Sequence, residues 1–176
     1  VQDWLTKNPY EFGVNWAGPM DVAIRAVNWT WALYLIFESR YLTDAFLARW
    51  LTSLQQHGNY LLQNLEDSWP HTNHLLANLA GLAYLGIVFP ELNDAGKWRN
   101  TGLKRFWEEI ERQVYPDGTS YEASVGYHRL VTEMGLSVAA LCVVNGIDIP
   151  DTVQARLSAM LDVVMSYTQP DGLAPQ

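Results

Sequence analysis

The chain has 176 residues, of which 49% are apolar and 17% charged, and its formal net charge is −8 at pH 7. That length suits one domain or part of one, and that apolar content argues against a disordered or low-complexity chain. Because the charge is negative and no run rich in Lys or Arg occurs, nucleic acid and anionic membrane surfaces are disfavoured as partners. Any anion site must then be local, built from a few cationic groups and helix ends.

Six helical segments are predicted, separated by clusters of Gly, Pro, Asn and Asp that stop helices and form turns. No segment shows sustained alternation with a period of two, so no strand is expected and the predicted fold class is all-α. In chain order the segments run roughly over Pro19–Ser39, Thr43–Glu66, His71–Phe89, Asp94–Tyr115, Ser124–Asn145 and Thr152–Gln169.

Two kinds of helix alternate along the chain. The first, third and fifth segments are apolar nearly all round, which is typical of buried helices. The second, fourth and sixth are amphipathic: in the fourth, Leu103, Phe106 and Ile110 share one stripe while charged residues lie outside it. An inner and an outer ring of helices are therefore predicted. His57 lies mid-helix on an outer segment and is expected to be solvated.

A weak internal repeat supports this arrangement. Pro116-Asp117-Gly118 recurs 54 residues later as Pro170-Asp171-Gly172, each time just after an outer helix. Stacked helical pairs of this length imply an α/α toroid or solenoid. Only three pairs are present, and the chain begins at Val1 rather than Met. We therefore expect residues 1–176 to be a single helical domain, an incomplete α/α toroid of about three antiparallel pairs and a fragment of a longer protein.

Polar and aromatic residues cluster at the starts of the first, third and fifth segments. The clusters are Asn15-Trp16, His71-Thr72-Asn73-His74 and Tyr127-His128. Because successive helices are antiparallel, these starts should meet at one rim. Convergent helix N-termini present unpaired N–H groups and positive dipole ends, which favour a carboxylate. Each cluster also has a structural interpretation, as capping, first-turn or core residues.

Two charged residues near these clusters also have alternative interpretations. Arg25 lies in a buried helix, so its charge needs a partner, either Asp21 or a substrate carboxylate. Glu122 either caps the fifth helix or pairs with a neighbour such as Arg129.

Other kinds of site have weak or no support. The pair His71-x-x-His74 lacks a carboxylate or third ligand close in sequence, so no metal and no cofactor is predicted. The chain contains no Gly-rich phosphate loop, no G-x-S-x-G motif and no Cys/His nucleophile arrangement. Paired carboxylates for hydrolysis, for example Asp117 with Glu122, are possible but not distinctive.

Short motifs run along almost the whole chain in a specific order. They are Asn8-Pro9-Tyr10, Gly13-Val14-Asn15-Trp16, Met20–Arg25, Thr72–Ala83, Pro116-Asp117-Gly118 and Tyr121–His128. In this combination the chain resembles the N-terminal helical domain of the heparinase II/III-like polysaccharide lyases. That superfamily also includes alginate lyases of the oligoalginate-lyase type.

The resemblance implies an α/α toroid followed by an antiparallel β-sandwich domain of the same parent chain. It also implies β-elimination at a uronic acid of an acidic polysaccharide. By this resemblance Asn73 would bind and neutralise the C5 carboxylate, with His74 as base or second carboxylate ligand. Tyr127 would donate a proton to O4 and, in syn elimination, also act as the base. The candidate substrate-binding residues are Asn15, Trp16, Arg25, His71, Glu122 and His128.

The sugar stays open between glucuronate, iduronate, mannuronate and guluronate. Some heparinase-type members carry Glu three residues after the His, where this chain has Ala77. The family also implies a periplasmic or secreted location. Two alternatives remain: an α/α-barrel glycoside hydrolase that uses carboxylates, and a non-catalytic carbohydrate-binding fragment.

Overall fold

The computed structural model of the chain describes residues 1–174. Over these residues it contains seven α-helices, one 3₁₀ turn and no strand beyond an isolated bridge between Val114 and Ser120. The all-α prediction is confirmed, and the six predicted segments correspond to α2–α7. The elements are α1 Gln2–Lys7, η1 Val14–Trp16, α2 Pro19–Ile36, α3 Asp44–Gln63, α4 Asn73–Val88, α5 Ala95–Gln113, α6 Val125–Val144 and α7 Asp151–Tyr167.

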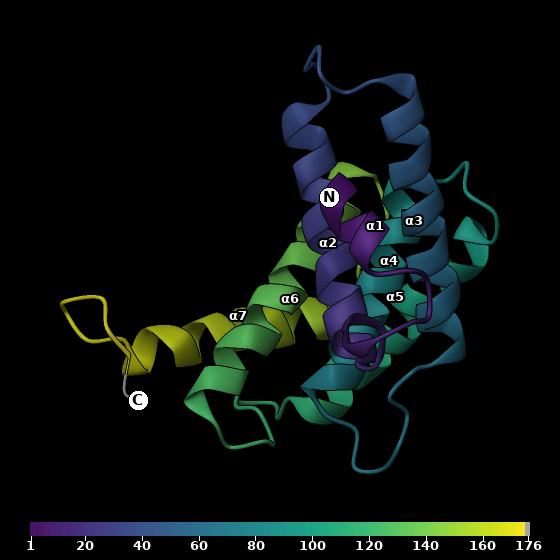
Figure 1. The fold of residues 1–176 in the computed structure, drawn as a ribbon. Helices are drawn as coiled ribbons and strands as arrows, with labels where there is room; N and C mark the ends of the chain where they lie inside the picture. The colour runs from purple at the N-terminus through teal and green to yellow at the C-terminus, as the bar shows by residue number, and fades with distance from the viewer. Residues whose placement is uncertain (175–176) are drawn as a thin grey trace.

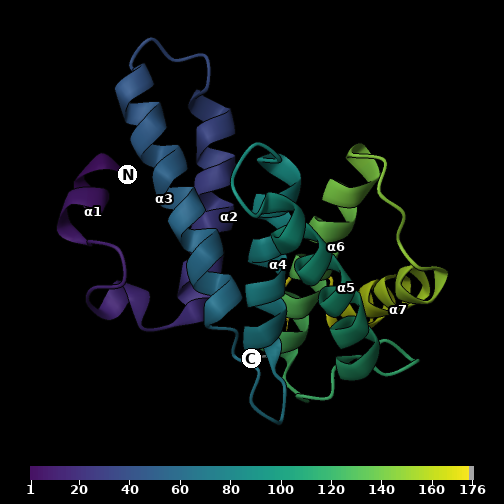
Figure 2. The same cartoon turned by 90° about the vertical axis from the view of Figure 1, so that its right-hand side faces the viewer.

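The helices form three antiparallel pairs, α2–α3, α4–α5 and α6–α7, as in an α/α toroid (Figure 1). The inner helices α2, α4 and α6 pack side by side, and the outer helices α3, α5 and α7 contact one another in turn. Figure 2 shows this succession from α3 and α2 through α4 to α6 and α7. The predicted inner and outer arrangement is therefore confirmed.

The three inner helices differ in how completely they are buried. Nearly every residue of α4 is buried, because α2, α3, α5 and α6 surround it. In contrast, α2 exposes Trp31, Tyr34 and Leu35, and α6 exposes Val143 and Val144. The prediction of full burial is thus wrong for α2 and α6, which stand at the two ends of the row of described inner helices.

Close packing fixes α4 against α5. A Cβ atom placed on Gly102 of α5 would lie 2.6 Å from the backbone nitrogen of Ala83, so the two helices meet almost backbone to backbone. Phe106 and Ile110 of α5 are fully buried in the same core. Each such side chain contributes about 1.5–3 kcal/mol relative to its exposed state. The core therefore packs against α4 along its length, including Leu75 and Leu76 in its first turn.

The repeated Pro-Asp-Gly motif forms the same turn twice. An oxygen of Asp117 accepts a hydrogen bond from the backbone N–H of Thr119 (2.9 Å), and Asp171 accepts one from that of Leu173 (3.0 Å). Gly118 and Gly172 follow with φ values of +89° and +81°. The sequence repeat is therefore a structural repeat at the ends of α5 and α7.

Within residues 1–174, α6 is the one helix long and apolar enough, by length and composition, to cross a membrane. About a third of that stretch is buried inside the domain. α6 carries Arg129 and Glu133 and packs against α4 and α7, as a member of the helical array.

Candidate functional site

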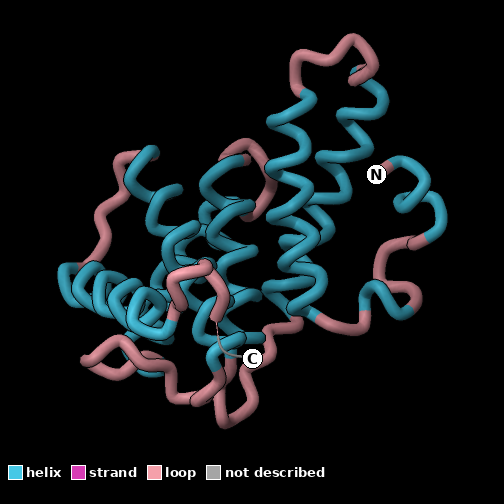
Figure 3. The backbone as a smooth tube through the Cα atoms, turned by 90° about the vertical axis from the view of Figure 1, so that its left-hand side faces the viewer, coloured by secondary structure: helices cyan, strands magenta, loops and turns pink. Residues whose placement is uncertain are grey.

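The starts of α2, α4 and α6 lie at one rim, at the lower end of the molecule in Figure 1. Glu66, in the loop before α4, accepts a hydrogen bond from the N–H of Met20 on α2 (3.0 Å), and its Oε1 lies 2.9 Å from Nδ1 of His74 on α4. Asn73 contacts Glu122 in the segment before α6. Figure 3 shows the loops that precede α4 and α6 at this same end. The predicted convergence of the three helix starts is confirmed.

Local capping sets where α4 and α6 begin. The Thr72 side chain accepts from the N–H of His74 (3.3 Å), and Ser124 accepts from that of Tyr127 (3.4 Å). Ser and Thr are preferred at this position because their oxygens satisfy free N–H groups of the first turn. The predicted segment starts roughly at His71, and α4 begins two residues later, at Asn73. Asn73, His74 and Tyr127 all lie in first turns.

Asn73 is 3% exposed, and its side-chain amide nitrogen donates to both carboxylate oxygens of Glu122 (3.1 Å each). Both sequence interpretations of Glu122 are wrong: Ser124 caps α6, and Glu122 pairs with Asn73 rather than Arg129. The partner lies 49 residues away in sequence, which a local pattern does not reveal. The amide of Asn73 thus already faces a carboxylate, one that belongs to the same chain.

The His74 side chain is half exposed, and its two ring nitrogens have different surroundings. Its Nδ1 lies 2.9 Å from Oε1 of Glu66, while the side chain is 51% exposed. Among residues 1–174, Nε2 has no hydrogen-bond partner. Nδ1 is therefore held by the protein, while Nε2 has no partner in the described part of the chain.

Tyr127 presents a free hydroxyl at the same rim. It lies in the first turn of α6 and is 51% exposed. Its hydroxyl group makes no hydrogen bond with any residue in the described range. A proton on that oxygen can therefore reach a bound molecule without first breaking an internal contact.

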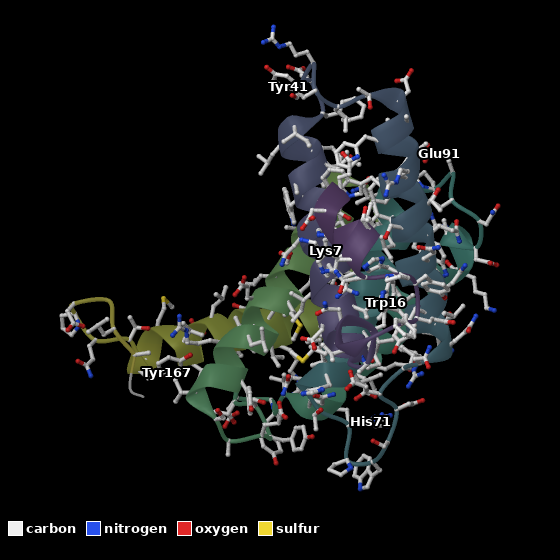
Figure 4. All side chains as sticks on the ribbon, viewed as in Figure 1. Lys7, Trp16, Tyr41, His71, Glu91 and Tyr167 are labelled. Atoms are coloured by element: carbon white, nitrogen blue, oxygen red, sulfur yellow. The ribbon has the colours of Figure 1, made fainter. Side chains whose placement is uncertain are left out.

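His71 is held by carboxylates on both sides. Nδ1 lies 3.0 Å from Oε1 of Glu109, and Nε2 lies 3.2 Å from Oδ1 of Asp67. Glu109 is 2% exposed and also pairs with Arg112. Figure 4 places His71 in the segment before α4. In this structure both ring nitrogens of His71 therefore face carboxylates of the same chain.

Arg25 and Trp16 form a buried cluster with α3. The Nε–H of Arg25 donates to Nε2 of His57 (2.9 Å). The guanidinium group lies over the rings of Trp4 and Trp16, 4.4 and 5.0 Å from their centroids. Trp16 is 3% exposed, so its ring offers no face to a sugar. Arg25 therefore has an imidazole and two aromatic rings as direct partners. Burial lowers its pKa to about 10, while the charge of Asp21 opposes this shift.

Two further candidates have hydrogen-bond partners in other parts of the chain. The Asn15 amide donates to Oδ1 of Asn8 (2.6 Å), within the N-terminal loop. His128 is 4% exposed, and its Nε2 lies 3.3 Å from the backbone oxygen of Met160 on α7. The three predicted clusters thus contribute unequally, with Asn73, His74, Glu122 and Tyr127 at the rim.

His57 is fully buried, which contradicts its predicted solvation. The face of α3 that carries His57 packs toward α2, and the Nδ1 atom lies 2.6 Å from the backbone oxygen of Ser53. Burial lowers the pKa of His57 from 6.5 to about 3, although the hydrogen bond to Ser53 opposes this shift. The folded protein therefore keeps this ring neutral where the unfolded chain binds a proton.

The His57 pKa predicts a specific loss of stability in acid. Because His57 takes up a proton only in the unfolded chain, the free energy of unfolding should fall as the pH drops from 6.5 toward 3. Between about pH 7 and pH 5 the loss from this residue is about 2 kcal/mol. The variant His57→Gln offers both an acceptor for Arg25 and a donor for Ser53, but it does not titrate. Urea unfolding at both pH values should show a loss about 2 kcal/mol larger in the wild type; equal losses would contradict the buried neutral ring.

The carboxylate pair considered for hydrolysis is not assembled. Asp117 is exposed, and the hydroxyl and N–H of Thr119 donate to it and lower its pKa. Glu122 faces Asn73 instead. Over residues 1–174 no group of three or more His, Cys, Asp or Glu side chains is placed to hold a metal ion.

A groove of about 160 Å³ runs between α2, α4 and α6. Its lining is mainly apolar and includes Ala77 and Leu130, with Glu133 at its edge. None of Asn73, His74 and Tyr127 lines it. The groove and the rim residues therefore do not coincide.

Sequence reasoning missed Glu66, which joins two helix starts. One signal for it exists: Asn78 lies in an otherwise apolar helix and is fully buried. A buried amide needs hydrogen-bond partners, so Asn78 implies an unseen polar neighbour. The sequence does not say that this neighbour is Glu66.

Comparisons with known proteins place the chain in context. A family model described as heparinase II/III N-terminus matches residues 1–176. Among curated proteins, a heparin-sulfate lyase of Pedobacter heparinus is 29% identical over 98% of this chain and 27% of its own length. A heparin-sulfate lyase of Bacteroides stercoris is 31% identical over 72% of this chain and 22% of its own length.

Solved structures give the same picture of the fold. A crystal structure of heparinase III superimposes with a TM-score of 0.84 at 24% identity, over 97% of this chain and 26% of that protein. A heparan sulfate lyase from Pedobacter heparinus gives a TM-score of 0.76 at 28% identity, over 99% of this chain and 28% of that one. The chain spans about a quarter of the length of the curated relatives it matches.

Proposed function

The chain belongs to the heparinase II/III N-terminus family, and we propose that it forms the helical part of the active site of a polysaccharide lyase. The reaction would be β-elimination at a uronic acid of an acidic glycan. The rim carries this proposal: Asn73, His74 and Tyr127 lie in the first turns of two neighbouring inner helices. The heparin-sulfate lyases named above also support a lyase.

The proposed reaction divides the chemistry among these three residues. Asn73 and the start of α4 bind the C5 carboxylate and draw negative charge away from C5. His74, or the Tyr127 phenolate in syn elimination, removes the C5 proton. The C4–O4 bond then breaks, its electron pair leaves with O4, and the Tyr127 hydroxyl protonates that oxygen. A C4=C5 double bond remains in the new non-reducing end.

The remaining polar residues act indirectly in this proposal. Glu122 holds the Asn73 amide in place. His71 and Glu109 secure the segment before α4 against α5. Since the chain as a whole has a net charge of −8, a polyanion would be received only where helix ends and cationic groups converge.

We further propose that a β-sandwich domain of the same parent chain completes the site. The shorter span of this chain relative to its relatives supports that view. Because those relatives are heparin-sulfate lyases, glucuronate- and iduronate-containing sulfated glycans are the first substrates to test. A periplasmic or secreted location stays a prediction.

A substrate panel tests this function. The natural protein would be incubated with heparan sulfate, heparin, alginate and polyglucuronate, and the ultraviolet absorbance of the unsaturated product would be followed. Rising absorbance on at least one glycan is expected. Reducing ends released without absorbance would indicate a hydrolase, and saturable binding without turnover would indicate a carbohydrate-binding module. Either result would overturn the lyase proposal.

A further inference from the structure

Glu66 is held by several donors at once. Its Oε2 accepts from the N–H of Met20 (3.0 Å) and from the side-chain nitrogen of Asn78 (3.0 Å). Its Oε1 lies 2.9 Å from Nδ1 of His74. The carboxylate therefore joins the first turn of α2 to two positions on α4.

The hydrogen bonds of Asn78 fix the orientation of its side-chain amide. The backbone N–H of Glu66 donates to Oδ1 of Asn78 (2.8 Å), so Oδ1 must face that backbone. The amide nitrogen of Asn78 then has to face the carboxylate. Asn78 is fully buried in α4, and Glu66 is only 28% exposed. Because Met20 lies at the start of α2, its N–H also presents a positive helix end to the carboxylate.

This geometry decides which nitrogen of His74 carries a proton. An ionised carboxylate only accepts hydrogen bonds, so the ring nitrogen that faces Glu66 must be Nδ1–H. A neutral imidazole has one N–H, which leaves the lone pair on Nε2. That nitrogen has no hydrogen-bond partner among residues 1–174, so it is the one available to a substrate.

We infer that Glu66 is the positioning residue of the lyase site: it fixes the tautomer and the direction of His74, so that Nε2 is the base for the C5 proton. This inference rests on the proposed function. It adds to that function a residue in the loop between α3 and α4, outside the motifs quoted above. Glu66 itself acts through His74.

The variant Glu66→Gln keeps the shape of the side chain but replaces one carboxylate oxygen by an NH₂ group, which donates hydrogen bonds. Its amide must turn its oxygen toward the two donors, Met20 and Asn78, so its NH₂ group faces His74. The ring can accept that N–H only if Nδ1 carries the lone pair, which moves the proton to Nε2. The variant should therefore invert the tautomer while it preserves most of the loop contacts.

Two measurements on the protein test this inference. Nitrogen-15 NMR of labelled histidine at mildly alkaline pH reports the tautomer, with His74→Gln to assign the signal. The expected result is Nδ1–H in the wild type and Nε2–H in Glu66→Gln. On a substrate from the panel, the kcat of Glu66→Gln should be at least about tenfold below that of the wild type, while its KM should change by less than about threefold. Glu108→Gln removes an exposed carboxylate on α5 and should change neither reading.

The outcomes separate this inference from the proposed function. An Nε2–H tautomer in the wild-type protein would overturn it, and this reading does not depend on any variant folding. An inverted tautomer with unchanged kcat would also overturn it, because His74 would then not be the base. If the wild type turns over no glycan, the proposed function fails. In that case the NMR measurement alone tests whether Glu66 determines the tautomer of His74.

Discussion

Replacing Tyr127 by Phe is expected to reduce turnover by about 10²–10⁴-fold, the range typical for loss of a general acid or base. The variant removes one oxygen and leaves the ring in place. Because the side chain is 51% exposed and its hydroxyl makes no hydrogen bond within residues 1–174, folding should be unaffected. Initial rates of absorbance change and a thermal unfolding curve would measure the two effects separately.

A second tyrosine offers a matched control. Tyr115 follows α5 and is 55% exposed, and it has no proposed role in the reaction. Tyr115→Phe should keep the wild-type rate. Wild-type turnover in Tyr127→Phe would remove Tyr127 from the mechanism, whereas an equal loss in both variants would indicate a nonspecific effect.

Replacing Gly118 by Ala should destabilise the fold by about 2–5 kcal/mol. A Cβ atom there would overlap the backbone of Ala159 on α7, which is not a flexible side-chain end and cannot move aside easily. The φ value of +89° adds strain for any residue with a Cβ atom. Urea unfolding monitored by circular dichroism would measure the change in the free energy of unfolding.

The internal repeat supplies the control for this variant. Gly172 occupies the same position in the second Pro-Asp-Gly turn with a φ of +81°, but a Cβ atom there would meet nothing within 4 Å. Gly172→Ala should therefore cost only the backbone strain, about 1–2 kcal/mol. Similar costs for the two variants would show that the contact between Gly118 and α7 is not tight.

The parts of this structure that the sequence predicts are those set by local patterns. Helix α4 is apolar on every side, which indicates a buried helix, and the antiparallel order of the helices then brings their starts to one rim. The repeated Pro-Asp-Gly turn gives the length of the helical pair. In contrast, α1 is six residues long and has no buried side chain, so it carries no readable hydrophobic period.

Local sequence patterns do not predict which residues the polar side chains contact. Asn73 meets Glu122 and His71 meets Glu109, at sequence separations of 49 and 38 residues. A histidine between two carboxylates and a histidine open to a substrate look the same in a sequence. Glu66, which contacts His74, lies outside the quoted motifs, so no local pattern reveals it.

The mass balance of the cleaved glycan tests the central proposal most directly. A defined uronate-containing tetrasaccharide would be digested with the natural protein, and the masses of both products would be measured by mass spectrometry. β-Elimination adds no water, so the two product masses should sum to the mass of the intact tetrasaccharide, and one product should carry the C4=C5 double bond. A sum greater by one water molecule would mean hydrolysis and would contradict the lyase chemistry proposed for Asn73, His74 and Tyr127.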